Sequence, residues 1–368
     1  MRVLVVNAGS STLKLRLLGA EDELVALRDM EWRNQDPDLE PLRAFLADAG
    51  EFDAVGHRVV HGGGEFRGPV VVDGGVVSRL TQLSDLAPLH NPPALAALQA
   101  VLQLVPDVPS VVCFDTAFHA DLYEEAAVYA VPWEWTERWG IRRYGFHGLS
   151  HAYAARRTAE LMGRPLLELR VVTCHLGAGA SLAAVHGGRS VDTTMGFTPL
   201  EGLVMATRSG SVDPGALLWL QERAGLSIDE MQDALEHRSG LLGLAGSADM
   251  REVLAAEVRG EQRGRLAVAV YVHRLRALIA AMASSMGGLE ALVFTGGVGE
   301  NSAWIRADAC AALGFIGVAV DPARNAVPGH GDVDLTAEGS HVRVLRILAR
   351  EDLQIASEVR RTLGATSR

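Results

Sequence analysis

The chain has 368 residues, enough for two domains that each bury a full hydrophobic core. Hydrophobic residues make up 48% and charged residues 21%, the composition of an ordinary soluble globular protein. The net charge of −11 excludes a general role on nucleic acid or on an anionic membrane surface. The N-terminus enters a predicted strand at once, without a signal peptide, and no charge-free apolar run is long enough to cross a membrane.

Short apolar, β-branched runs alternate with helical stretches along most of the chain. The predicted strands, in chain order, are Val3–Asn7, Ala54–Val60, Val70–Val72, Val111–Asp115, Val171–His175, Ser181–His186, Leu292–Thr295 and Val342–Ile347. The predicted helices are Asn91–Leu104, Gly148–Met162, Gly215–Ala224, Ile228–His237, Met250–Ala256, Gly264–Ser285, Ser302–Leu313 and Arg350–Leu363. This alternation favours an α/β fold with parallel or mixed sheets.

The three cysteines, Cys113, Cys174 and Cys310, lie far apart, each among apolar neighbours and without CxxC spacing. We therefore expect buried free thiols, rather than disulfides or metal ligands, and a cytoplasmic protein.

A pattern near the N-terminus is repeated in the second half of the chain. Residues 4–11 are an apolar strand that runs into a turn of glycine and small residues, and residues 172–181 follow the same order. A third glycine-rich turn, at residues 293–301, leads into a helix. Glycines let the backbone approach a ligand closely, and a helix N-terminus favours negative charge. The two repeated units predict a duplicated domain, and the three turns together predict a nucleotide cleft.

Lys14 is the only lysine in the chain, and it closes the first of these turns. An ammonium is a compact point charge, whereas a guanidinium is a planar fork, so the two are not equivalent where a phosphate must be reached through a narrow gap. We interpret Lys14 as a phosphate contact; the alternative is one lysine that survived by chance.

Several ordered segments together resemble the acetate kinase family, within the larger actin/hexokinase/Hsp70-type superfamily. In chain order they are Asn7–Ser11, Gly56–Gly63, Ala87–Pro92, Phe114–His119, Arg143–Gly148, Thr194–Leu203, Thr207–Gly210, Ser239–Gly243 and Thr295–Asn301. The resemblance implies two duplicated RNase H-like (actin-like ATPase) domains with a nucleotide cleft between them, formed by residues 1–117 plus 352–368 and by residues 118–351. It also implies reversible, ATP-dependent phosphorylation of acetate to acetyl phosphate.

Phosphoryl transfer between a carboxylate and ADP needs positive charge on the phosphoryl oxygens, in-line alignment and a metal on the nucleotide side. By resemblance, Arg58 and Arg208 are the substrate-binding and transition-state arginines, His147 is the transition-state histidine and Asp115 is the active-site acid/base. Because acetate already carries its nucleophilic oxygen, we expect Asp115 to orient an arginine or the metal shell rather than to act as a base. The alternatives are surface arginines, a structural histidine and a capping aspartate.

The resemblance also assigns binding residues. Those that line the space for the acetate methyl group are Val60, Leu89, Phe146 and Pro199. Asn7 and Glu351 match the positions for Mg²⁺, or Mn²⁺, and both offer the hard oxygen that magnesium prefers. The nucleotide contacts are Lys14, His175, Leu176, Gly177, Ala178, Gly179, Asp249, Met250, Arg251, Gly297, Val298, Gly299, Glu300 and Asn301. A homodimer formed through the second domain is implied as well, with Gly264–Ser285 either in the core or at that contact.

Two positions depart from the family pattern. Ala178 stands where the family usually has asparagine, which removes one hydrogen bond worth roughly 1 kcal/mol. Arg350 places a fixed cation beside Glu351 in the sequence.

Two alternatives to acetate phosphorylation stay open. One is a propionate or butyrate kinase of the same family, because one methylene is worth only ~1–3 kcal/mol of discrimination. The other is a non-catalytic nucleotide-binding switch, since a fold does not fix function. Arg58, Asp115, His147 and Arg208 would have no obvious task in such a switch.

Overall fold

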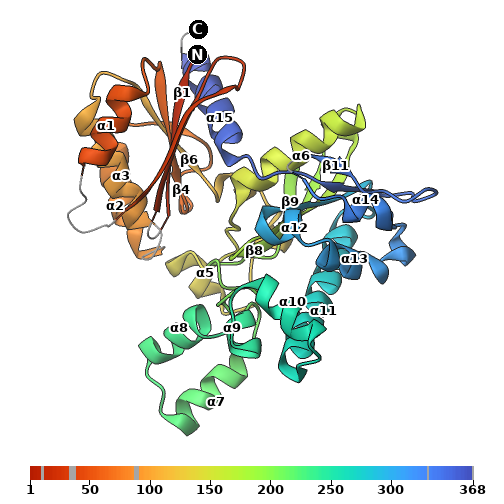
Figure 1. Cartoon of the computed structure of the whole chain (residues 1–368). Helices are drawn as coiled ribbons and strands as arrows, with labels where there is room; N and C mark the ends of the chain where they lie inside the picture. The colour runs from red at the N-terminus through yellow and green to blue at the C-terminus, as the bar shows by residue number, and fades with distance from the viewer. Residues whose placement is uncertain (10–11, 33–38, 87–90, 330, 367–368) are drawn as a thin grey trace. The chain divides into compact units, whose positions relative to one another are not determined.

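The computed structural model describes residues 1–9, 12–32, 39–86, 91–329 and 331–366. The chain divides into two compact units, each with one six-stranded sheet (Figure 1). Unit 1 consists of Met1–Asp121, Phe146–Tyr153 and Arg350–Arg368, and unit 2 of Leu122–Gly145 and Ala154–Ala349. The domain limits expected from the sequence stay a prediction.

The sheet of unit 1 has the strand order β3-β2-β1-β4-β6-β5. Its strands are β1 (Val3–Ala8), β2 (Thr12–Leu18), β3 (Leu24–Glu31), β4 (Ala54–Val59), β5 (Val70–Val71) and β6 (Ser110–Phe114). The central strands β1, β4 and β6 run parallel to one another, whereas β2, β3 and β5 pair antiparallel with their neighbours.

Helices cover both faces of this sheet, which explains why β1 reads as a continuous apolar run. Leu4 and Val6 pack against α1 (Glu40–Asp48) and α3 (Asn91–Leu104), while Val3 and Val5 pack against α15 (Glu351–Thr366). Figure 1 shows α1 and α3 on one side of the strands and α15 on the other. The remaining helices of unit 1 are α2 (Gly74–Gln82) and the 3-10 turns η1 (Leu83–Leu86) and η2 (Ala117–His119).

The sheet of unit 2 repeats this arrangement, with the order β11-β12-β10-β7-β8-β9. Its strands are β7 (Arg170–Leu176), β8 (Ala180–His186), β9 (Arg189–Thr193), β10 (Ala291–Thr295), β11 (Val333–Asp334) and β12 (Arg343–Arg346). β7 pairs antiparallel with β8 and parallel with β10, as β1 does with β2 and β4. The duplication predicted from the two glycine turns is therefore confirmed at the level of sheet topology.

The helices of unit 2 vary from one turn to 24 residues. They are α4 (Glu124–Ala127), α5 (Trp133–Trp139), η3 (Leu166–Glu168), α7 (Pro214–Ala224), α8 (Ile228–His237), α9 (Gly240–Ala245), α10 (Met250–Val258), α11 (Gln262–Ser285), α12 (Gly296–Asn301), α13 (Ala303–Ala311), η4 (Gly314–Ile316) and α14 (Pro322–Ala326). α6 (Gly148–Met162) begins in unit 1 and ends in unit 2.

α11 is, among the helices described, the one whose length and hydropathy would allow it to cross a membrane. Its apolar side chains Val268, Leu275 and Ile279 are buried, and the helix packs against β7 and β8 and against α10. This burial supports the interpretation of α11 as a core helix of unit 2.

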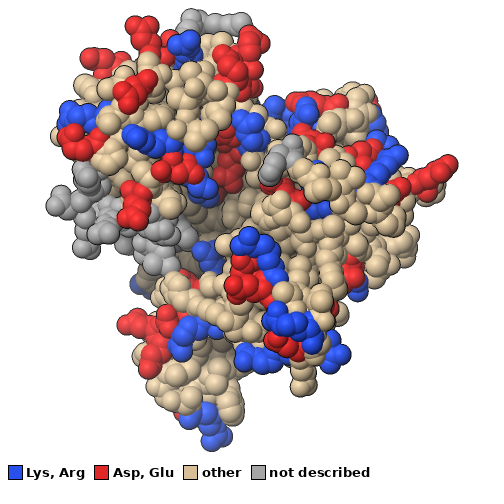
Figure 2. Space-filling model, in the orientation of Figure 1, with Lys and Arg blue, Asp and Glu red and all other residues tan. Residues whose placement is uncertain are grey.

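Surface charge and cysteine chemistry follow the expectations from composition. Figure 2 shows basic and acidic side chains interspersed over the visible face, without a continuous basic field. The three cysteines are buried free thiols, as predicted.

Lys14 lies differently from the prediction. It does not close the turn but stands inside β2, exposed to solvent and directly opposite Asn7 of β1. The reason is that β2 begins already at Thr12 and pairs with β1 from Leu13 to Leu18.

Candidate active site

Three residues distant in sequence meet at one edge of the sheet in unit 1. Asn7, the last residue but one of β1, is in register with Arg58 of β4, and Asp115 directly follows β6. The backbone N–H of Asp115 donates to the carbonyl of Val59 at 3.1 Å, which holds Asp115 beside the end of β4. Carboxyl ends of parallel strands open at the same edge, and this is the position at which α/β folds bind ligands.

The guanidinium of Arg58 connects this group. Its Nη2 and Nε donate to the two carboxylate oxygens of Asp115 at 2.6 and 3.1 Å, and its Nη1 donates to Oδ1 of Asn7 at 3.2 Å. Glu351, at the start of α15, accepts from Asn7 Nδ2 at 3.3 Å and lies 3.9 Å from Arg58 Nε. The exposed fraction of the Asp115 side chain is 1%, and that of Arg58 is 15%. We call Asn7, Arg58, Asp115 and Glu351 the carboxylate–arginine cluster.

Burial and charge act in opposite directions on the two ionised partners. Burial raises the pKa of Asp115 above its ordinary value, and the charge and hydrogen bonds of Arg58 oppose that rise. Burial lowers the pKa of Arg58, but the negative charges of Asp115 and Glu351 outweigh it, so the net shift is upward. Arg58 therefore stays a cation, and Asp115 depends on it for its charge.

The cluster has donors suited to a magnesium ion. Glu351 offers a partly exposed carboxylate and Asn7 an amide oxygen, and magnesium is usually held by one or two such groups together with substrate phosphates. The sequence suggested that the cation of Arg350 would stand beside Glu351. Instead Arg350 Nε and Nη2 donate to Asp352 at 2.9 Å, so that Arg350 is neutralised by another partner.

Phe146 and His147 also belong to unit 1. The Phe146 ring is 1% exposed and packs edge-on against His61, with 5.4 Å between ring centroids. The backbone N–H of His147 donates to the carboxylate of Asp115. Val60 is buried directly after β4. Leu89, which was also predicted to line the methyl pocket, lies outside the described residues.

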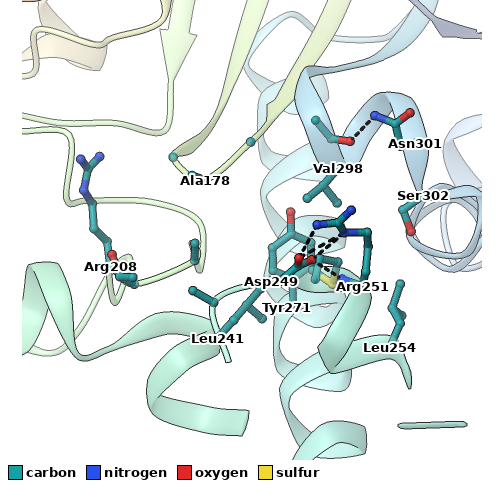
Figure 3. A pocket seen from close by; sticks show the side chains of 17 residues that line it. Ala178, Arg208, Leu241, Asp249, Arg251, Leu254, Tyr271, Val298, Asn301 and Ser302 are labelled. Carbon is teal, nitrogen blue, oxygen red and sulfur yellow. Dashed lines mark hydrogen bonds and ion pairs between the residues drawn. The ribbon is translucent and has the colours of Figure 1, made fainter. Parts of the chain in front are cut away.

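Unit 2 contains a pocket of about 770 Å³ between the β7–β8 turn, α10, α11 and α12 (Figure 3). Most residues predicted to contact the nucleotide line it, namely Gly177, Ala178, Gly179, Asp249, Met250, Arg251, Gly297, Val298 and Asn301. The wall is largely apolar, as expected where a flat base and a sugar are bound by a few placed polar groups.

Besides Lys14, four residues predicted to contact the nucleotide are not in the lining. Leu176 and Gly299 are buried in β7 and α12, and His175 stands beside Thr295 across the β7–β10 pair. The Glu300 carboxylate binds backbone groups rather than lining the pocket: its Oε1 accepts from the N–H groups of Gly296 and Ala349, both at 2.9 Å. Its charge fixes the start of α12.

Part of this pocket was not predicted from the sequence. Tyr271 of α11, Leu254 of α10 and Leu241 of α9 line it as well. Leu241 falls in a segment that resembles the family, but neither Tyr271 nor Leu254 carries a local signal. Both are single positions on helices whose apolar pattern indicates only core packing.

Arg208 lies at one end of the pocket, away from Asp249 and Arg251 (Figure 3). Its Nη1 donates to the carbonyl of Pro199 at 3.4 Å, and burial lowers its pKa. The loop that follows bends at Gly210, where φ is 70° and a Cβ would lie 2.3 Å from the carbonyl oxygen of Leu203.

We expect Gly210→Ala to displace the Arg208 loop. A side chain at positive φ costs about 1–2 kcal/mol, and the clash with a carbonyl adds to it. The variant should melt several degrees lower than the wild type. Gly314→Ala is the matched control, because a Cβ there meets no atom and φ is unstrained. Equal melting temperatures for the two variants would contradict the expected strain.

Comparison with known proteins agrees with this architecture. A model of the acetokinase family matches residues 39–357. The acetate kinase of Leifsonia xyli subsp. xyli is 46% identical, over 99% of this chain and 99% of that protein. Among solved structures, Porphyromonas gingivalis acetate kinase superposes with a TM-score of 0.91 at 35% identity, covering 98% of this chain and 99% of that one. A propionate kinase from Francisella tularensis subsp. tularensis gives 0.89 at 34% identity, covering 97% and 98%. The chain belongs to the acetokinase family.

Proposed function

We propose that this protein transfers the γ-phosphoryl group of ATP to acetate. In the reverse reaction it transfers the phosphoryl group of acetyl phosphate to ADP. An oxygen of the acetate carboxylate forms the new P–O bond, and the bond between the γ-phosphorus and the β–γ bridging oxygen breaks, so that ADP leaves with that oxygen. The acetate oxygen is already ionised, so this step requires no general base.

The observation that carries the proposal is the carboxylate–arginine cluster in a chain of this family. A guanidinium held by Asp115 is fixed in orientation before substrate arrives, which is how preorganised charge stabilises a transition state. An orienting role for Asp115 requires a direct contact with an arginine, and the Arg58–Asp115 ion pair is such a contact. Arg58 would bind the carboxylate of acetate, and His147 and Arg208 would donate to the phosphoryl oxygens as their charge changes.

Asn7 and Glu351 would hold the magnesium ion, which neutralises charge on the nucleotide phosphates when bound. The unit 2 pocket would bind the nucleoside, with its phosphates near the backbone N–H groups of the Gly177–Gly179 turn. Lys14, which stands opposite Asn7, would add positive charge for the phosphates.

The apolar side chains of Val60 and Phe146, with Pro199 and Leu89, would surround the methyl group of acetate. Propionate is the second candidate substrate, because a solved structure that superposes closely with this chain is that of a propionate kinase. We also propose a cytoplasmic homodimer formed through unit 2, on the family resemblance alone.

The test is a hydroxylamine trap of the acyl phosphate, with ATP, magnesium and acetate, propionate or butyrate in parallel reactions. We expect rapid hydroxamate formation with acetate and slower formation with propionate. A higher kcat/KM for propionate than for acetate would identify propionate as the preferred substrate. If the protein bound ATP but formed no product with any of the acids, it would be a nucleotide-binding switch.

Ala178 allows a gain-of-affinity prediction. Ala178→Asn would restore a side-chain donor at the phosphate turn, and an ordinary hydrogen bond contributes about 1 kcal/mol, or roughly fivefold. We expect the KM for ATP to fall by about that factor while the KM for acetate stays constant. Ala178→Leu is the control without a donor. An Asn variant that binds ATP no better than the wild type would show that this turn does not contact phosphate.

A further inference from the structure

The conformation of His147 is strained. Its φ is 56°, in the left-handed region, and among the described residues other than glycine only Asp22 shares a positive φ. A non-glycine residue in this region is strained and persists only where its surroundings fix it. The chain also enters unit 1 from unit 2 at Phe146, directly before this residue.

Three contacts from Asp115 and His119 fix the backbone here. Nε2 of His119 bonds to the carbonyl oxygen of Phe146 at 3.1 Å. The N–H of His147 donates to the Asp115 carboxylate, and the N–H of Gly148 donates to the Asp115 carbonyl at 3.0 Å. A Cβ on residue 148 would lie 2.0 Å from that carbonyl oxygen, so only glycine allows this close approach. Asp115 holds two of the anchors, and His119 holds the third.

The chemistry of the third anchor fixes the state of His119. A carbonyl oxygen only accepts, so Nε2 of His119 must carry a proton. His119 is fully buried, and burial lowers its pKa to about 4, so the ring is neutral at pH 7. Phe118 and His151 lie edge-on to it, with ring centroids 5.4 and 5.7 Å away. The Nε2–H group of His119 therefore acts as a donor to the Phe146 carbonyl.

We infer that His119 is a positioning residue for phosphoryl transfer. Through the Phe146 carbonyl, its Nε2–H holds Phe146 and His147 in the strained backbone conformation that places the His147 imidazole for the reaction. This inference rests on the proposed function only in giving His147 a role in the transfer; the placement of His147 itself does not depend on it.

The first test compares His119→Gln with His119→Met. A glutamine amide carries an N–H at about the reach of Nε2, whereas methionine fills a similar volume without any donor. Because a misplacement of about 1 Å costs up to ~10²-fold in rate, we expect kcat for acetyl phosphate to fall about 10- to 100-fold in the Met variant. The Gln variant should recover most of this loss. The KM for ATP should stay constant in both, because the nucleoside pocket is built by unit 2. Equal losses in the two variants would overturn the inference.

A double-mutant cycle separates positioning from general stability. In the His147→Ala background, His119→Met should cost little further rate, because the group that it positions is already absent. A loss of the same factor in both backgrounds would overturn the inference. If His119→Met does not fold, His119→Asn takes its place, since the asparagine amide is one carbon too short to reach the Phe146 carbonyl.

A second readout is independent of activity. In enzyme labelled with ¹⁵N-histidine and free of substrate, the ring resonances of His147 are identified by their loss in His147→Ala. We expect them to shift or broaden in His119→Met and to return in His119→Gln. Unchanged His147 resonances would overturn the inference whatever the rates are. Shifted resonances in a protein that forms no acyl phosphate would support the placement and overturn the proposed function instead.

Discussion

Arg208→Ala should reduce kcat for acetyl phosphate by about 10³-fold or more, the contribution typical of an arginine that stabilises charge in phosphoryl transfer. Arg208 is partly buried, burial lowers its pKa, and it donates to the Pro199 carbonyl. A desolvated guanidinium gains most from an anion whose charge it meets in the transition state. ATP affinity measured by calorimetry should change by less than tenfold.

Two variants sharpen this prediction. Arg208→Lys should recover only part of the rate, because an ammonium cannot reproduce a bidentate contact. Arg223→Ala is the matched control, since Arg223 is an exposed arginine of the same unit on α7. If Arg208→Ala kept its kcat within tenfold but lost ATP binding, Arg208 would be a nucleotide contact rather than a transition-state residue.

Arg58→Met should abolish acyl phosphate formation and also destabilise unit 1 by about 3–5 kcal/mol at pH 7, because it leaves the buried charge of Asp115 unpaired. The measurement is urea unfolding, followed by a probe in unit 1. Arg67→Met is the matched control. It breaks an ion pair of the same unit, Arg67–Asp121, that is more than half exposed on both sides, so it should cost at most about 1 kcal/mol.

The loss in Arg58→Met should depend on pH in a defined direction. Burial raises the pKa of Asp115 above the ordinary value of 3.8, and in this variant Arg58 no longer opposes the rise. The folded state then binds more protons than the unfolded state in the window above 3.8, so its stability falls as pH rises through that window. The deficit relative to wild type should therefore shrink as pH falls towards 4.

Removing the stranded charge gives the control for this pH dependence. Asp115→Asn in the Arg58→Met background should recover much of the stability at pH 7 and remove the additional pH dependence that Arg58→Met introduces. A deficit in Arg58→Met that is constant from pH 7 to pH 4 would show that lost packing, not the charge of Asp115, causes it.

Local signals determined most of the central elements. α8 begins at the predicted residue because Ser227 and Glu230 form a capping box, a pattern that spans only four residues of sequence. The central strands β1, β7 and β10 are largely apolar runs with mostly buried residues, and this pattern is visible in the sequence. The family followed from ordered motifs along the chain, and the comparisons confirm it.

Edge elements needed the rest of the structure. β3 was not predicted, because its residues are mostly exposed and show no clean alternation. It becomes a strand through pairing with β2, which supplies its hydrogen bonds.

α12 also depends on contacts from outside its own residues. The sequence indicated only a turn at these residues, and the buried Arg306 stabilises the helix by donating to the carbonyls of Gly299 and Glu300.

For the candidate site, the residue types and the position of Asp115 next to the end of a strand could be read from the chain alone. The partners of these residues could not, because they come from distant parts of the chain. Arg58 reaches Asn7 and Asp115 across 51 and 57 positions of sequence, because parallel register brings three strand ends to one edge. Arg350 is next to Glu351 in sequence but pairs with Asp352. The strained φ of His147 and its anchor on His119 had no local signal, because backbone conformation there is set by contacts made 27 residues apart.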